Sequence, residues 1–99
     1  MSDVYVKIFR QGGHVLVAAC DAELLGRTLR EGNMVFKIQE QFYGGSIVPV
    51  EEAIKMAKEA TCTNLIGPNI VETAIKKGLV HPQSVIKIAG VPHAQTIRL

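Results

Sequence analysis

The sequence has few aromatic residues and no tryptophan: Phe and Tyr together account for 5% of its 99 positions. Hydrophobic residues make up 47% of the chain, so a core must be built mainly from Val, Ile, Leu and Ala. That share excludes a disordered chain. A chain of this length has room for one domain and not for two, so we expect a single domain over residues 1–99.

Long apolar runs are also missing. No stretch approaches the roughly 18–20 residues that cross a bilayer, and Met1 to Lys7 lacks the basic region followed by an apolar one that marks a secretion signal. These two absences lead us to expect a cytoplasmic protein with no membrane partner.

Neither cysteine content nor charge indicates a particular chemistry. Cys20 and Cys62 lie far apart without a C-x-x-C pattern, so we expect reduced thiols. The cysteines and the three histidines have none of the spacings of a zinc site, and no metal or cofactor is predicted. Eleven basic against nine acidic residues give a net charge of +2, too slight to indicate a nucleic-acid partner by charge alone.

The N-terminal part predicts a β-hairpin followed by a third strand. Two apolar runs, residues 4–11 and 14–20, are separated by a Gly-Gly dipeptide that suits a primed turn. The resulting register places Tyr5 opposite Cys20. Residues 34–39 alternate between apolar and other side chains, as in a strand.

The remaining pattern predicts two helices and two short strands. Residues 49–60 and 68–77 carry apolar stripes at helical spacing, and Gly78 can end the second helix in a left-handed conformation. Residues 85–88 and 95–99 resemble short strands. We therefore expect an α+β fold: a compact single domain with an N-terminal β-hairpin plus third strand, two consecutive central helices and C-terminal short strands.

The segment from Gly90 to Gln95 combines Pro92, His93 and Gln95. An imidazole beside an amide can bind an anion, orient a substrate or act as a general base. The favoured alternative is a turn in which the His93 and Gln95 side chains satisfy backbone groups.

Cys20 and Asp21 stand where the second strand is expected to end. A thiol there can act as a nucleophile if the fold brings a base such as His93 close to it. Alternatively, Cys20 is a small buried hydrophobic residue, and Asp21 caps a short helix over residues 22–25.

Two glycine-containing segments offer backbone amides to a ligand. One contains Tyr43, Gly44 and Gly45, and the other runs from Asn64 to Gly67 before the second helix. Neither has the spacing of a known phosphate-binding loop, so ordinary loop geometry is the favoured explanation. Five basic residues are candidates for an RNA-facing surface, without an aromatic-basic RNP signature to support them, and an ordinary solvated surface is the default explanation: Arg10, Arg27, Arg30, Lys37 and Arg98.

Five motifs together resemble an archaeal family catalogued as domain of unknown function 424. They are Val-Leu-Val-Ala-Ala-Cys-Asp at 15–21, Glu-Leu-Leu-Gly-Arg-Thr at 23–28, Phe-Tyr-Gly-Gly at 42–45, Asn-Leu-Ile-Gly at 64–67 and Gly-Val-Pro-His-Ala-Gln at 90–95. The resemblance spans almost the whole chain. It implies an archaeal cytoplasmic protein with a compact α+β fold and no established activity.

Two functional hypotheses follow. The first is a non-enzymatic module that binds RNA or a ribonucleoprotein, in the context of translation or RNA metabolism. The second is a small hydrolase or transferase that uses Cys20 or His93, so the sequence leaves open whether the protein is an enzyme. A homo-oligomer is compatible with the sequence but not indicated by it. The binding candidates common to these hypotheses are Asp21, Tyr43, Gly44, Gly45, Asn64, Gly67, Pro92, His93 and Gln95.

Overall fold

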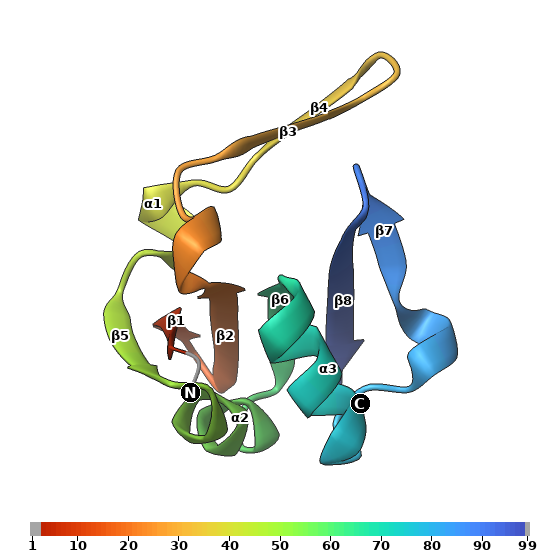
Figure 1. Ribbon diagram of the computed structural model, residues 1–99. Coiled ribbons are helices and arrows are strands. Elements are labelled where there is room, and N and C mark those ends of the chain that lie inside the picture. Colours follow the sequence, from red (N-terminus) through yellow and green to blue (C-terminus); the bar gives the residue numbers. More distant parts are fainter. Residues whose placement is uncertain (1–2, 99) are drawn as a thin grey trace.

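The computed structural model describes residues 3–98. Eight strands, three α-helices and two 3-10 turns follow one another along the chain (Figure 1). The strands are β1 (Asp3–Gln11), β2 (His14–Asp21), β3 (Thr28–Glu31), β4 (Met34–Lys37), β5 (Ser46–Pro49), β6 (Cys62–Ile66), β7 (Ile86–Ile88) and β8 (Val91–Ile97). The helices are α1 (Glu40–Tyr43), α2 (Val50–Lys58) and α3 (Pro68–Lys76), and the 3-10 turns are η1 (Ala22–Leu24) and η2 (Pro82–Ser84).

Six strands form one sheet in the order β5-β1-β2-β6-β8-β7. All neighbours are antiparallel except β2 and β6, which run parallel. The predicted N-terminal hairpin is confirmed, including its register: Gln11 pairs with His14, and Tyr5 pairs with Cys20. β3 and β4 form a separate two-stranded sheet that extends beyond the rest of the molecule (Figure 1).

The two faces of the six-stranded sheet are covered differently. α2 and α3 pack on one face over an aliphatic core that contains no aromatic side chain, as the low aromatic content predicts. The other face carries a second cluster, to which η1, α1 and the β3–β4 hairpin contribute, and the partly buried aromatic side chains gather there. The α+β class of the fold is therefore confirmed.

Both central helices form where their apolar stripes predict. In α2 the side chains of Ile54 and Ala57 are buried against the sheet. α3 begins at Pro68 and is followed by Gly78, whose φ of 77° is the left-handed conformation expected there. The backbone N–H of Leu79 donates to the carbonyl of Ala74 at 2.9 Å, which closes the last turn.

The sequence analysis missed three strands. β6 lies between the two helices, so these helices are not joined by a plain loop. β3 pairs with β4 across a turn at Gly32-Asn33, and the predicted strand over 34–39 ends at Lys37 and lies outside the main sheet. β5 follows α1, which occupies part of the segment expected to be a loop, and pairs with β1 at the edge of the main sheet.

The C-terminal strand is longer than predicted. The turn is made by Ala89 and Gly90, both at positive φ, and β8 runs from Val91 to Ile97. Pro92 and His93 therefore lie in a strand and not in a loop, which is a correction of the sequence analysis. The predicted strand over 95–99 includes Leu99, which lies outside the described residues.

Candidate functional site

Strand register brings several of the predicted site residues onto the face that carries the second cluster. On this face Ala18 of β2 lies beside Asn64 of β6, and Asn64 lies beside Gln95 of β8. In the next row, Ile66 separates Cys20 from His93. Because side chains alternate between the two faces of a strand, residues two positions apart share this surface.

Tyr43, Asn64 and His93 form a hydrogen-bonded chain. The Tyr43 hydroxyl donates to Asn64 Oδ1 at 2.6 Å, and His93 Nε2 lies 3.0 Å from the same oxygen. Three residues from α1, β6 and β8 thus meet at one amide, and two of them are almost wholly enclosed, with Tyr43 2% and His93 8% exposed. The small Ala18 side chain belongs to the same cluster as the Tyr43 ring.

The hydrogen bonds among Tyr43, Asn64 and His93 define which nitrogen of the His93 ring is protonated. An amide oxygen only accepts hydrogen bonds, so His93 Nε2 carries a proton, and in the neutral ring Nδ1 has a free lone pair. Burial lowers the pKa of His93 below its usual 6.5 and so favours the neutral ring. Burial also raises the pKa of Tyr43, with a smaller contribution from Cys20, so its hydroxyl remains a donor.

Asn64 lies where two hollows meet. The first, of about 340 Å³, is lined by two phenylalanines, a tyrosine and three side chains with nitrogen-bearing polar groups: Phe36, Phe42, Tyr43, Lys37, Gln39 and Asn64. The second, of about 240 Å³, reaches along β6 and β8 past Phe42 to Gln95. Together they form what we call the sheet-face groove.

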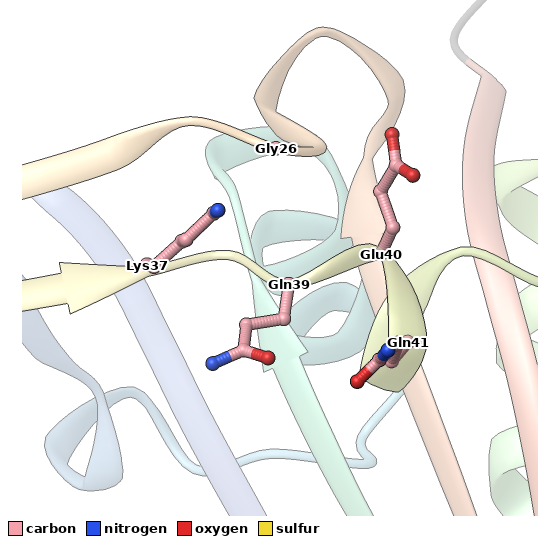
Figure 2. A pocket seen from close by; sticks show the side chains of 5 residues that line it. All are labelled: Gly26, Lys37, Gln39, Glu40 and Gln41. Atoms are coloured by element: carbon pink, nitrogen blue, oxygen red, sulfur yellow. The ribbon is translucent and has the colours of Figure 1, made fainter.

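A third hollow, of about 470 Å³, adjoins the first through Lys37 and Gln39 and extends to Gly26. Figure 2 shows Lys37 and Glu40 extending from the chain on one side and the Gln39 amide on the other. Polar and charged side chains dominate this hollow, whereas the first contains the rings of Phe36 and Phe42. The aromatic part of the sheet-face groove therefore borders on a polar hollow.

The aromatic side chains of the groove are held in place by one another. Phe42 stacks on Phe9 with ring centroids 5.5 Å apart, and the Tyr43 ring meets Phe42 edge-on at 4.8 Å. Phe36 approaches the His93 ring edge-on at 6.0 Å. Phe36 and Phe42 are only half-buried, so each keeps part of its ring surface available to a ligand.

Cys20 lacks the surroundings of a reactive thiol. Its side chain is 0% exposed, and burial together with the Asp21 and Glu23 charges raises its pKa to about 12. Two strand spacings, about 10 Å, separate its backbone from that of His93, with Ile66 between them. The Cys20–His93 pair is therefore not in hydrogen-bonding reach, and Cys20 matches the alternative expectation of a small buried residue.

Asp21 caps a helix, but not the one expected. It makes no side-chain bond to η1, and its carboxylate instead accepts the backbone N–H groups of Asn69 and Ile70 at the start of α3, each at 2.9 Å. Burial raises the pKa of Asp21, opposed by these two hydrogen bonds. The side chain lies against Gly67, and Gly67 N–H donates to the carbonyl of Pro92 at 2.9 Å. Asp21, Gly67 and Pro92 thus join β2, α3 and β8 and do not line the groove.

The two glycines after Tyr43 are required by close packing. A Cβ at Gly44 would lie 2.7 Å from the carbonyl oxygen of Glu40, and one at Gly45 would collide with the carbonyl oxygen of Val6. Both glycines let the chain leave α1 and pair with β1. Neither glycine lines the groove, so of the predicted binding residues only Tyr43, Asn64, His93 and Gln95 belong to the groove or its hydrogen-bonded chain.

The sequence analysis did not single out Phe36, Phe42, Lys37 or Gln39 as parts of one site. A signal was present in Gly32-Asn33, a two-residue turn typical of a hairpin, between residues 28–31 and 34–37. Recognising that hairpin would have separated Phe36 from the main sheet. No local signal would have placed it beside His93, because that contact depends on how the hairpin folds back over β7 and β8.

Residues 3–98 contain no group of three or more His, Cys, Asp or Glu side chains that would hold a metal ion. Within the same range, no helix is both long enough and apolar enough to cross a membrane.

The chain matches the sequence model of the family described as Protein of unknown function (DUF424) over residues 9–99. It is also similar to a solved structure described as an uncharacterized conserved protein from Methanopyrus kandleri, with a TM-score of 0.83 and 26% sequence identity. That similarity covers 98% of this chain and 94% of the other. No protein of curated function resembles the chain significantly in sequence. Neither description states an activity, so function has to be argued from the site.

Proposed function

We propose that this chain, which belongs to the DUF424 family as its motifs predicted, is a non-enzymatic module that binds single-stranded RNA in the sheet-face groove. The observation that carries the proposal is the composition of the first hollow, which is lined by two half-buried phenylalanine rings, two amides and an ammonium group. Single-stranded RNA offers bases that stack on aromatic rings, base edges that bond amides, and phosphates that attract lysine.

The distribution of charge supports the same ligand. Residues 27–37 form the β3–β4 hairpin and its approach, and they contain three basic residues, Arg27, Arg30 and Lys37, against one acidic residue, Glu31. The excess of this segment, 3 − 1 = +2, equals the net charge of the whole chain. Arg27, Arg30 and Lys37 are exposed, so a polyanion beside the groove meets a locally positive segment.

The carboxylate of Glu31, the acidic residue of that segment, already accepts a hydrogen bond from the protein backbone. Glu31 Oε1 accepts the backbone N–H of Ala89 at 2.5 Å, which ties the hairpin to the turn between β7 and β8. The carboxylate therefore has a structural partner, and the hairpin is anchored next to the strand that carries His93. A cytoplasmic location, where RNA is present, is part of this proposal.

The proposal is tested with a fluorescein-labelled single-stranded oligoribonucleotide and the purified full-length chain, by fluorescence anisotropy at low and moderate salt. Lys37 lines two of the hollows, and Lys55 is an exposed lysine on α2, which covers the opposite face of the sheet. K37A should weaken binding several-fold. It should also reduce the slope of log binding constant against log salt concentration by about one, the value for one lost phosphate contact, whereas K55A should leave binding unchanged.

Absence of binding by the wild-type chain at low salt would overturn the proposal. So would equal losses in K37A and K55A, because these would indicate attraction to the overall charge and not to the groove. A duplex of the same sequence should bind more weakly than the single strand, since its stacked bases cannot reach the phenylalanine rings.

A second candidate is a small hydrolase or transferase in which His93 acts as a general base. The observation in its favour is the Tyr43–Asn64–His93 chain, which holds the neutral imidazole with Nδ1 free. Cys20 is too deeply buried to supply the nucleophile, so in this candidate His93 accepts the proton of a water molecule in a hydrolase, or of a second substrate's hydroxyl group in a transferase. Hydrolysis of an ester or phosphodiester probe that disappears in H93Q but survives in C20A would favour it over RNA binding alone.

A further inference from the structure

The β3–β4 hairpin forms one wall of the sheet-face groove but stands outside the main sheet. Its strands pair with each other, and a two-stranded ribbon is marginally stable in water unless another element packs on it. Of its strand residues Leu29 is buried and Phe36 half-buried, and the others are exposed. Segments with so few buried apolar side chains open locally at a lower free energy than the core.

The two ends of the hairpin are held differently. At the base, Ile38 is 0% exposed in the second cluster and accepts the backbone N–H of Gly26 at 2.8 Å. Its own N–H donates to the carbonyl of Arg27, also at 2.8 Å. Near the turn, Glu31 accepts the backbone N–H of Ala89 through a solvent-exposed hydrogen bond. The base is therefore fixed in the core, whereas the tip is tied to the β7–β8 turn by an exposed bond.

The position of the hairpin sets the shape of the first hollow. Phe36 approaches the His93 ring edge-on at 6.0 Å and lines this hollow together with its neighbour Lys37. The facing groups, Phe42 and Asn64, belong to α1 and β6. A displacement of the hairpin therefore moves Phe36 away from groups that stay with the main sheet, and it opens the groove.

We infer that the β3–β4 hairpin is a movable wall of the groove, which opens as a unit from its base at Ile38 and which the Glu31–Ala89 hydrogen bond helps to hold closed. An open wall lets a strand enter the groove from the side, and closing brings Phe36 and Lys37 onto it. A ligand that contacts these two residues shifts the population toward the closed form. The closing by RNA rests on the function proposed above, whereas the opening of the free chain does not.

Hydrogen exchange of the ¹⁵N-labelled full-length chain, followed by NMR, tests the opening. In the wild type, the hydrogen-bonded amides of β3 and β4 should be about a hundredfold or more less protected than those of β1 and β2. They should share a common opening free energy, because they open together.

Two variants isolate the tie at the tip. E31A should lower the protection of the hairpin amides by about fivefold, as the loss of one hydrogen bond would produce. E72A is the matched control, because Glu72 is an exposed glutamate on α3, across the sheet from the hairpin, and it should leave them unchanged. Saturating single-stranded RNA should raise the protection of the hairpin in the wild type, since Phe36 and Lys37 reach it only in the closed form.

Protection of β3 and β4 equal to that of β1 and β2 would overturn the inference. A graded loss of protection from base to tip would overturn it too, because it indicates fraying and not opening as a unit. Equal protection in E31A and E72A would overturn the role of Glu31. RNA that binds without protecting the hairpin would overturn its closing, and RNA that does not bind at low salt would overturn the proposed function while the opening of the free chain stands. The wild-type measurement needs no variant, so the inference can fail even if E31A does not fold.

Discussion

The side chain of Asp21 occupies the space that a Cβ atom on Gly67 would need. A Cβ built at Gly67 would lie 2.5 Å from Asp21 Cγ, and the glycine has a φ of 125° and a ψ of 149°. That conformation is essentially restricted to glycine. The contact fixes the end of β2 against the start of α3, and it explains why an aspartate and a glycine 46 positions apart belong to one structural unit.

Replacing Asp21 by alanine should lower the free energy of unfolding by about 2–4 kcal/mol, since two backbone N–H groups of α3 would lose their acceptor at a buried site. Urea unfolding measures the loss. D21N, which keeps one acceptor oxygen, should lose less. D3A serves as the matched control, because Asp3 is exposed, and it should change stability little. Equal stability of D21A and D3A would show that the cap at α3 contributes nothing.

Substituting Gly67 by alanine should cost about 3 kcal/mol or more, because the new Cβ would meet Asp21 in a backbone conformation that alanine avoids. Thermal unfolding of G67A and G13A provides the comparison. Gly13 has open space around its Cα and no positive φ, so G13A should stay within about 1 kcal/mol of the wild type. A G67A variant as stable as G13A would contradict the close contact.

The two free thiols should differ sharply in reactivity. Cys62 is half-buried beside the groove, whereas Cys20 is fully buried with a pKa raised to about 12. A chromogenic disulfide reagent should therefore titrate one thiol in the folded protein and two in denaturant. C62S should abolish the native reaction and C20A should preserve it. Rapid labelling of folded C62S would restore Cys20 as a candidate nucleophile.

His93 should make stability depend on pH. Its pKa in the folded protein lies below the 6.5 of the unfolded chain, so the unfolded state binds the proton more readily. The contribution of His93 to stability is thus fully present above 6.5 and is lost as the pH falls through the folded-state pKa. Urea unfolding between about pH 7.5 and pH 5 should show a decline in the wild type that is smaller in H93Q. Parallel declines in the two proteins would assign the effect to other groups.

Local patterns were sufficient for the elements whose signals lie close together in the chain. The register of the N-terminal hairpin follows from its Gly-Gly turn and alternating side chains, and α3 follows from Pro68, an apolar stripe and Gly78. In each case the residues that define the element are near neighbours in sequence, and their steric preferences act before any distant contact forms.

Long-range packing decided the rest. Nothing local distinguishes residues 62–66 from a connection between helices, and they become a strand because β2 and β8 pair with them on either side. The same pairing puts Asn64 beside Gln95, and the packing of α1 against the sheet brings the Tyr43 hydroxyl to Asn64. The sequence by itself determined the fold class, the hairpin and the helices. Only the tertiary structure decided that Tyr43, Asn64 and His93 meet, because residues far apart along the chain become neighbours through strand pairing and through the packing of α1 on the sheet, which no short-range pattern encodes.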